Sequence, residues 1–321
     1  MIIKTNIDVQ KFVSKSLALG NFDNLKPSLE NALISYILPL VGEQFIDKLE
    51  LVYNDEAAIA SYKKALEKTQ RALVFYGLME DAKVADVIRT STGLQIVETS
   101  SNKTAFEYQK RDLIKKYADD ADTFTDDLLE FLEKNKDTFK DFSENISIYS
   151  KTKEFIINNA KEFTDYRNIN ESRRTFIALK GSMKDVELLK IKPSIGNTVF
   201  DTLKEMILDD DLNDKYKALH ELLKPAFANL VVADAIPELN FKFKAGGVEL
   251  TSFAQSNTKS TLVDDEFKKY ILNCQTKGIA YLKEAVDFIN ANPTDFGIIP
   301  ETQKEIISYA NDKNKKHYFG F

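Results

Sequence analysis

The sequence predicts a mainly α-helical protein made of two tandem helical-bundle modules, each with a β-hairpin insertion. Three observations lead to this prediction: an internal repeat, long amphipathic segments, and two short alternating segments that surround glycines. Only 7 Pro and 11 Gly occur in 321 residues, so little in the chain interrupts long helices. Each copy of roughly 115 to 120 residues is long enough to bury its own core.

The repeat appears when the sequence is shifted by 154 positions. Identical residues of the first copy are Phe22, Leu25, Lys26, Ser28, Ile37, Pro39, Gly42, Asp47 and Leu49, which fall on Phe176, Leu179, Lys180, Ser182, Ile191, Pro193, Gly196, Asp201 and Leu203. Further along, Phe131, Asn135 and Phe139 match Phe288, Asn292 and Phe296 at a shift of 157. The second copy therefore contains about three additional residues before this point.

From the repeat we expect five parts. These are an N-terminal arm at 1–20, a first module at 21–142, a linking helix within 143–174, a second module at 175–297 and a C-terminal tail at 298–321. In the arm, we expect a short extended piece and then a helix that Asp8 caps. We expect the linking helix around Lys151 to Phe163.

Within the first module, apolar residues recur at helical spacing from Leu29 to Tyr36, and Pro39 is expected to interrupt that helix. A turn at Gly42 and a helix that buries Phe45, Ile46 and Leu49 should follow, and Pro193 to Leu203 repeats this arrangement. The long helices are predicted from Ala57 to about Ala85, Asp214 to about Ala235, about Phe106 to Lys134, and about Asp264 to Asn290. A further helix is predicted from Glu301 to Ala310.

After the first long helix of each copy, the periodicity changes from about 3.6 residues to 2. Residues 241–250 alternate Phe and Lys before Gly246 and Gly247, which predicts a β-hairpin whose turn needs positive φ. Residues 87–97 predict a weaker hairpin with Gly93 at its turn.

The composition excludes several function classes. The net charge of −6 argues against binding that relies on neutralising phosphates, because nucleic-acid-binding domains usually carry clustered Lys and Arg. The single cysteine, Cys274, excludes disulfides within the chain and thiolate metal clusters, and we expect it to be a small core residue. The first residues lack the apolar core of a signal peptide, and no run of about eighteen apolar residues occurs. We therefore expect neither export by that route nor a membrane span.

No residue pattern predicts a reaction, a metal site or a cofactor. His220 and His317 are preceded three residues earlier by Lys217 and Asn314, whereas a di-metal bundle needs an acid there. The run Asp209 to Asp211 lacks the glycine and closing glutamate of a calcium loop. We interpret it as a solvated surface, and we give the same interpretation to Asp119, Asp120, Asp122, Asp126 and Asp127.

Two features predict contacts with partners instead. A two-stranded ribbon in a helical module is marginal alone, which favours a partner contact over packing on its own domain. The aromatic residues behind three lysines at the C-terminal end predict either docking in a neighbour's groove or folding back, and the sequence leaves both open, with contact to an anionic lipid surface as a weaker alternative. The candidate contact residues are Ile88, Arg89, Gly93, Leu94, Phe241, Lys242, Phe243, Lys244, Gly246, Gly247, Tyr318, Phe319 and Phe321.

Four segments of the chain carry a resemblance to a known family: residues 125–135, 172–179, 191–196 and 222–230. They resemble an uncharacterised family of proteins encoded by phages and prophages of the Bacteroidetes. Each half is also similar to the helical head-tail connector module of tailed phages, which has helices, a hairpin or long loop, and a closing helix.

The resemblance implies a non-enzymatic neck adaptor of the virion that is assembled in the host cytoplasm. It implies a homo-oligomeric ring of about twelve subunits on the portal protein, in contact with further neck or tail proteins. DNA would pass through without specific binding, and no membrane would be involved. A cytosolic helical protein-binding module, a ring protein nearer the tail, and an enzyme remain alternatives.

Overall fold

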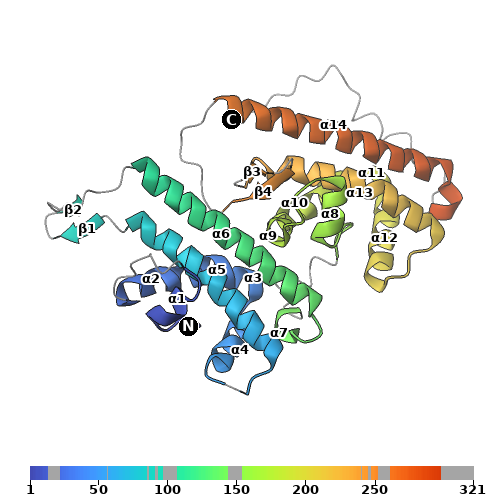
Figure 1. Cartoon of the computed structure of the whole chain (residues 1–321). Coiled ribbons are helices and arrows are strands. Elements are labelled where there is room, and N and C mark those ends of the chain that lie inside the picture. Colours follow the sequence, from blue (N-terminus) through green and yellow to red (C-terminus); the bar gives the residue numbers. More distant parts are fainter. Residues whose placement is uncertain are drawn as a thin grey trace. The chain divides into compact units, whose positions relative to one another are not determined.

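A computed structural model describes residues 1–13, 22–55, 57–84, 87–90, 93–96, 107–143, 154–239, 241–244, 247–251 and 261–297. The protein is mainly helical (Figure 1). The described residues form two compact units. Unit 1 takes its residues from Met1–Lys153, Asn158–Lys180 and Glu238–Asp264, and unit 2 takes them from Glu154–Ile157, Gly181–Pro237 and Asp265–Phe321.

Unit 1 is built around two long helices that run side by side, α5 (Ala60–Val84) and α6 (Glu107–Lys134) (Figure 1). Its other helices are α1 (Asn6–Gln10), α2 (Phe22–Ala32), η1 (Leu33–Ile37), α3 (Leu38–Val41), α4 (Glu43–Tyr53), α7 (Lys140–Ser143), α8 (Ala160–Tyr166) and α9 (Arg173–Ala178). Helix α2 packs on α5 where Gly77 leaves no room for a side chain, since a Cβ there would overlap Leu29. The apolar face that the sequence predicts for α5 is therefore buried on more than one side.

An aromatic cluster closes one end of unit 1. The ring of Phe139 is fully buried and meets the rings of Phe45, Tyr62 and Phe131 at centroid distances of 6.0, 5.0 and 5.6 Å. The side-chain amide of Asn135 donates to the carbonyl of Phe131 at 2.8 Å and so ends α6. The turn after α6 thus brings Phe139 back onto the core.

Unit 2 contains all or most of α10 (Lys180–Val186), η3 (Glu187–Ile191), α11 (Lys192–Ile195), α12 (Asn197–Asp209), α13 (Asp214–Ala235), α14 (Thr261–Ala291) and η4 (Pro293–Phe296). Helix α14 packs closely on α13, because a Cβ on Gly278 would lie 2.6 Å from Cγ of Leu230. Cys274 is buried in α14, as the sequence predicts. Phe296 packs edge-on against Tyr216 and Phe288, at 5.2 and 5.9 Å.

The elements of the two halves follow the same order at the same spacing. The π-helices η1 and η3 begin 154 positions apart, at residues 33 and 187, and so do α5 and α13, at residues 60 and 214. The predicted interruption at Pro39 takes an unexpected form, because the chain passes through a π-turn and Pro39 then lies in the first turn of α3. Proline is tolerated there, since the N–H that it lacks would have no partner within the helix.

Local details are also shared between the halves. Gly42 and Gly196 both have positive φ, 84° and 88°, and each precedes the next helix. The Tyr36 hydroxyl donates to Glu80 at 2.7 Å, and the corresponding Lys190 contacts Asp234 at 3.2 Å. The contact is retained although its chemistry has changed. This correspondence is compatible with a tandem repeat.

The correspondence begins earlier in the chain than the sequence analysis indicates. Ile2 and Ile156, 154 positions apart, are both buried in segments outside the helices and strands. The carbonyl of Ile2 accepts from Gln70 at 2.6 Å, and that of Ile156 lies 2.6 Å from Nε2 of His220. The segments around Ile2 and Ile156, in the regions predicted as an arm and a linking helix, therefore occupy equivalent positions in the two halves.

Short capped helices follow both segments and correct two predictions. Thr5 caps α1, and Asp8 completes a capping box from inside the helix instead of serving as the cap. The predicted linking helix is reduced to the seven residues of α8, because the Asn159 side chain accepts from the Glu162 N–H and starts the helix there. Residues 151–153 of that prediction lie outside the described residues.

Replacing Asp8 by asparagine should lower the free energy of unfolding at neutral pH by about 1 kcal/mol. Burial opposes ionisation, but hydrogen bonds from Lys4, Tyr53, Lys11 and Thr5 hold the pKa of Asp8 below its ordinary value. That stabilisation is complete above the unfolded-state pKa of about 3.9 and is lost as pH falls through the lower folded-state pKa. Urea unfolding should therefore show a deficit for Asp8→Asn that shrinks below about pH 4.

The exposed Asp47→Asn in α4 is the matched control and should leave stability unchanged at both pH values. A deficit of Asp8→Asn that stayed constant down to about pH 2 would contradict the role given to the ionised carboxylate.

Two antiparallel strand pairs lie where the sequence predicts hairpins. Strand β1 (Val87–Thr90) pairs with β2 (Gly93–Ile96), and β3 (Phe241–Lys244) pairs with β4 (Gly247–Leu250). Lys244 lies opposite Gly247, so the connection is residues 245–246, which lie outside the described part of the chain. The described strands β3 and β4 belong to unit 1, whereas the sequence assigns them to a second module at 175–297. The compact units thus divide the chain differently from the predicted boundaries.

Candidate interaction site

The second strand pair is held by hydrogen bonds to the region before and within α9. The N–H of Val248 donates to the carbonyl of Asn168 at 3.0 Å. The N–H of Leu250 donates to Oγ1 of Thr175 at 3.1 Å, and the Arg174 guanidinium donates to the Leu250 carbonyl. Strand β4 is therefore fixed to α9 on the side away from β3.

Gly247 is required at this junction for space. A Cβ on this residue would overlap the carbonyl of Asn168, and backbone atoms cannot move away as a side chain can. Glu249, two residues on, is buried and accepts from the Asn170 amide at 3.4 Å. The close approach of strand and loop thus depends on a glycine.

The loop before α9 has an unusual backbone. Asn170 and Glu171 both have positive φ, 56° and 52°, which non-glycine residues adopt at a cost of about 1 kcal/mol each. Ser172 then caps α9, because its hydroxyl accepts from the Thr175 N–H at 3.1 Å. The N–H of Asn170 donates to the side chain of Asn168 at 2.8 Å, and the N–H of Glu171 donates to Oγ1 of Thr164 at 3.0 Å, so both strained residues are held by hydrogen bonds.

Asp126 of α6 binds the start of α9. Its carboxylate accepts from the Arg174 N–H at 2.9 Å and from the Ser172 hydroxyl at 2.8 Å. Burial raises the pKa of Asp126, although the bonds to Arg174 and Ser172 act in the opposite direction. One carboxylate thus satisfies two donors at a helix N-terminus.

Arg174 also forms a buried ion pair with Asp122, one turn earlier in α6. Its guanidinium lies 2.8 Å from the carboxylate, and the two side chains are 6% and 1% exposed. Asp122 accepts a second hydrogen bond from the Tyr76 hydroxyl of α5 at 2.8 Å. The charge of each member is therefore compensated inside the unit.

We call Asp122, Asp126, Ser172, Arg174 and Thr175 the polar junction. It extends toward η1 through Tyr76, whose ring stacks on the Tyr36 ring at a centroid distance of 4.4 Å. Burial and the hydrogen bond to Glu80 raise the pKa of Tyr36. The junction connects α6 with α9 and, through the hydrogen bond of Asp122 to Tyr76, with α5. Its charged side chains therefore take part in structural contacts.

The interpretation of Asp122 and Asp126 as a solvated surface is wrong. Composition favours solvent for an acidic run, but these two residues are four apart and face α9, where Arg174 and Ser172 compensate them. The spacing of the two aspartates and the Arg173–Arg174 pair were the signals available in the sequence. The prediction holds for Asp209 to Asp211, which are exposed.

The predicted contact residues fall into three groups. Phe241 and Gly247 are buried within unit 1. A second group lies in the strand pairs, where the backbone is described but the side chains are not: Ile88, Arg89, Gly93, Leu94, Lys242, Phe243 and Lys244. Gly246, Tyr318, Phe319 and Phe321 lie outside the described residues. The junction contributes buried anchors that this set of residues omits.

Unit 2 contains a second anchor, which holds Glu154–Ile157. Glu187 accepts from the Ile156 N–H at 2.9 Å and pairs with Lys204 at 2.8 Å. Burial raises the pKa of Glu187, and Lys204 opposes that shift. Because the carbonyl of Ile156 is bound by His220, both backbone groups of this residue have partners.

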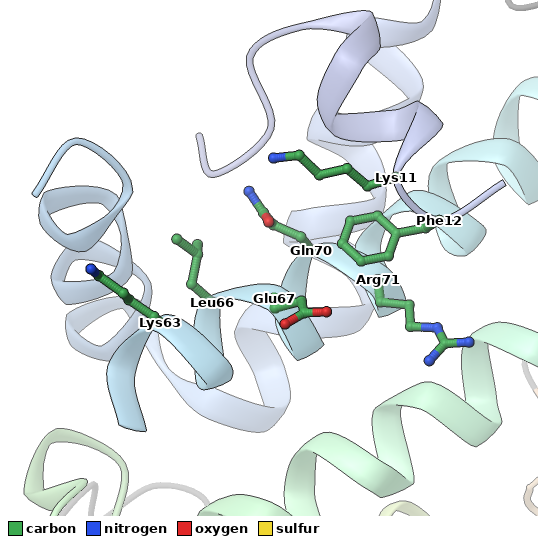
Figure 2. A pocket seen from close by; sticks show the side chains of 7 residues that line it. All are labelled: Lys11, Phe12, Lys63, Leu66, Glu67, Gln70 and Arg71. Carbon is green, nitrogen blue, oxygen red and sulfur yellow. The ribbon is translucent and has the colours of Figure 1, made fainter. Parts of the chain in front are cut away.

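A pocket of about 550 Å³ opens between α1 and α5 in unit 1 (Figure 2). It is lined by Lys11, Phe12, Lys63, Leu66, Glu67, Gln70 and Arg71. Several of its polar groups already have partners: Lys11 binds Asp8, Gln70 binds Ile2, and Arg71 lies 4.0 Å from the Phe124 ring. The pocket is consequently a surface recess with mixed charge.

Other kinds of site were sought in the described part of the chain. There, no three His, Cys, Asp or Glu side chains gather as a metal site requires. Of the helices searched within the described residues, none has the length and apolar character needed to span a membrane.

Comparison with known proteins gives one result. No curated protein and no solved structure matches the chain significantly. The model of the family of unknown function DUF6712 matches residues 25–151 and 191–304. These segments have 127 and 114 residues, which together make 241 of 321. They correspond to the two halves that share their order of elements, and the chain belongs to this family.

Proposed function

We propose that this protein is a structural head-tail connector of a tailed bacteriophage, in which two tandem modules, each with a hairpin insertion, arose by internal duplication. It would assemble as a ring of about twelve subunits between portal and tail, with a channel for DNA. The proposal rests on the resemblance of each half to connector modules. It also rests on the order and spacing of the structural elements that the two halves share.

The observation that carries the proposal is that shape is kept while side-chain chemistry changes. The π-helices, the glycines with positive φ and the long helices recur at a spacing of 154 residues. The contact between Tyr36 and Glu80 becomes one between Lys190 and Asp234. An enzyme would be constrained at reacting groups, whereas an adaptor is constrained in the surfaces that it presents.

The charge agrees with a channel protein that does not grip DNA. Each chain carries a net charge of −6, so a ring would have an acidic wall. Such a wall does not displace the counterions of the DNA phosphates and therefore does not bind DNA tightly. The hairpins and the C-terminal aromatic residues would provide contacts between subunits and rings. No catalytic residue, metal or cofactor forms part of this proposal.

Deleting Tyr318–Phe321 should weaken ring assembly and leave helical content unchanged. The physical reason is that these aromatic residues would be anchors that are lost at an interface, while the helical core is untouched. Negative-stain imaging and sedimentation of the purified protein measure the first effect, and circular dichroism measures the second. A chain of full length with Tyr318, Phe319 and Phe321 replaced by serine should behave like the deletion.

If both variants form rings as the wild type does, the C-terminal aromatic residues do not contribute to ring assembly, and this part of the proposal is wrong. A wild-type chain that forms no rings, either alone or with its portal, would contradict the connector function itself.

A helical protein-binding module remains the second candidate, and the open pocket beside α1 favours it (Figure 2). Such a module would stay monomeric and bind a partner peptide there. Glu67 lines the pocket and is exposed, so Glu67→Lys would weaken binding without changing the fold or the oligomeric state.

A further inference from the structure

Each half contains one π-turn at the same place in its repeat. The turn η1 lies between α2 and α3 in unit 1, and η3 lies between α10 and α11 in unit 2 (Figure 1). Their sequences, LISYI and ELLKI, share only the last isoleucine. π-turns inside helices are rare and occur frequently at functional sites. The form of the backbone has thus been kept in both halves while its side chains changed.

The widened turn places an additional residue on the solvent side of each helix. On the buried side, two successive core residues are five positions apart, Ala32 and Ile37 in unit 1 and Val186 and Ile191 in unit 2. An α-helix has 3.6 residues per turn, so an interval of five stays on one face only where the turn holds an extra residue. The extra residue is accommodated away from the core.

An apolar side chain lies on the solvent side of both turns. Ile34 of η1 and Leu188 of η3 are 63% and 45% exposed. In the described part of the chain, no other two exposed large apolar side chains are separated by 154 residues. A single exposed leucine is ordinary on a protein surface. Folding does not require an exposed apolar side chain at equivalent positions of two copies, so its retention indicates a contact with a partner.

Both exposed residues have apolar neighbours along the chain. We call Ile34, Leu38 and Pro39 the first patch, and Leu188, Leu189 and Pro193 the second patch. Leu189 is 72% exposed, both prolines are exposed, and Leu38 is half-buried. Each half therefore presents a small apolar surface beside its π-turn.

The charge that precedes the two patches has opposite sign. Glu30 lies one turn before Ile34 and is exposed, and its equivalent before Leu188 is Lys184, which is also exposed. Lys26, 3.9 Å from Glu30, corresponds to a lysine in the second half and does not distinguish the two patches. Two first patches in contact would bring like charges together, whereas a first and a second patch would bring opposite charges together.

Two further charges border only the second patch. Asp185 is exposed and corresponds to Asn31, and Lys192, which is 27% exposed, corresponds to Leu38. Lys192 pairs with Asp201 at 2.7 Å, and the residue equivalent to Asp201 in unit 1 is also an aspartate. Because Asp185 and Lys192 offset each other, the difference in sign at the preceding position remains.

We propose that the first patch of one chain binds the second patch of another copy of the chain, with Glu30 opposite Lys184. Each chain carries one patch of each kind, and the two differ, so the contact is heterologous and can continue from chain to chain. It closes into a ring where the rotation between neighbours allows closure. The inference rests on the proposed ring function and names one of its interfaces.

One substitution in each patch tests the contact. Ile34→Asp and Leu188→Asp should each weaken self-association at least about tenfold in sedimentation velocity, because a charge is placed within an apolar contact. The matched controls are Leu51→Asp in unit 1 and Leu208→Asp in unit 2, at residues that are 70% and 57% exposed and lie outside the patches. Both controls should associate like the wild type.

Mixing the two patch variants tests the pairing. Ile34→Asp retains an intact second patch and Leu188→Asp an intact first patch, so an equal mixture should form a dimer with one chain of each and grow no further. Each variant alone should remain monomeric at the same concentration. Dimers of Ile34→Asp alone would mean that the second patch binds itself, and they overturn the inference.

Exchanging the two charges tests which residues face each other. Glu30→Lys should weaken association, since it places two lysines opposite each other, and adding Lys184→Glu should restore it. A double variant that associates no better than Glu30→Lys overturns the inference.

Two further results would also overturn it. One is a wild-type chain that is monomeric at all concentrations. The other is an unfolding midpoint of monomeric Ile34→Asp or Leu188→Asp that is lower than that of the control in the same unit, which would mean that the patch is covered by its own chain.

Imaging separates this inference from the function on which it rests. Rings that persist in both patch variants overturn the inference and leave the connector function standing. Association that is lost in the patch variants but forms only open chains in the wild type supports the inference and contradicts the ring function.

Discussion

Replacing Arg174 by alanine should lower the free energy of unfolding of unit 1 by about 3–5 kcal/mol. The substitution leaves the buried carboxylate of Asp122 without its cation, and it also removes the donor to the carbonyl of Leu250. A buried charge without compensation costs much more than the pair contributes over apolar residues. Urea unfolding followed by circular dichroism measures the loss.

The neighbouring Arg173 is the matched control. Its side chain pairs with Glu133 at 2.7 Å, and the two side chains are 19% and 28% exposed, so water reaches both charges, unlike those of Arg174 and Asp122. Arg173→Ala should cost less than about 1 kcal/mol. Equal losses for the two arginines would contradict the special role of the polar junction.

A double variant tests the cause of the loss. Asp122→Asn added to Arg174→Ala removes the orphaned charge and keeps an oxygen acceptor for the Tyr76 hydroxyl. The double variant should therefore be more stable than Arg174→Ala alone. If it is less stable, the loss arises from packing and not from an uncompensated charge.

Replacing Phe139 or Phe296 by alanine should each cost about 3–5 kcal/mol, but in different units. Phe139 meets Phe45, Tyr62 and Phe131 in unit 1, and Phe296 meets Tyr216 and Phe288 in unit 2. Removing a buried ring loses its transfer free energy and leaves a cavity. Hydrogen exchange measured by mass spectrometry reports the loss of protection in each unit.

The conservative variants Phe139→Leu and Phe296→Leu keep most of the buried volume and should lose less than half as much. Phe139→Ala should reduce protection in α4, α5 and α6, and Phe296→Ala in α13 and α14. A substitution that left its own cluster fully protected would contradict the equivalence of these two closing turns.

Periodic segments were predicted well from the sequence. The bounds of α13 agree with the prediction, because Asn213 caps its start and a broad apolar face continues to Ala235. For α5, α6 and α14 the predicted ends differ from the observed ends by at most three residues, and the end of α6 at Lys134 agrees. The predicted burial of Phe45, Ile46 and Leu49 in α4 is confirmed.

The errors arose where local preference competes with a distant partner. Asp122 and Asp126 have the composition of a solvated surface, and only Arg174 and Ser172, about fifty residues later, make their placement against α9 tolerable. The linking helix was overestimated because Asn159 starts α8 as its cap and the N–H of Ile156, in a bend before it, donates to Glu187. The equivalence of Ile2 and Ile156 was missed because two identical residues are too weak a signal without their shared contacts.

The sequence by itself determined the helical class, the position of the long helices, the two alternating segments and the repeat of 154 residues. Each of these depends on periodicity, breakers or identity, which are properties of neighbouring residues along the chain. The tertiary structure decided which charges are buried together, where β4 is attached and which apolar residues of the π-turns stay exposed. These depend on partners brought together from distant positions, since a buried charge or an uncovered apolar patch has meaning only relative to what packs against it.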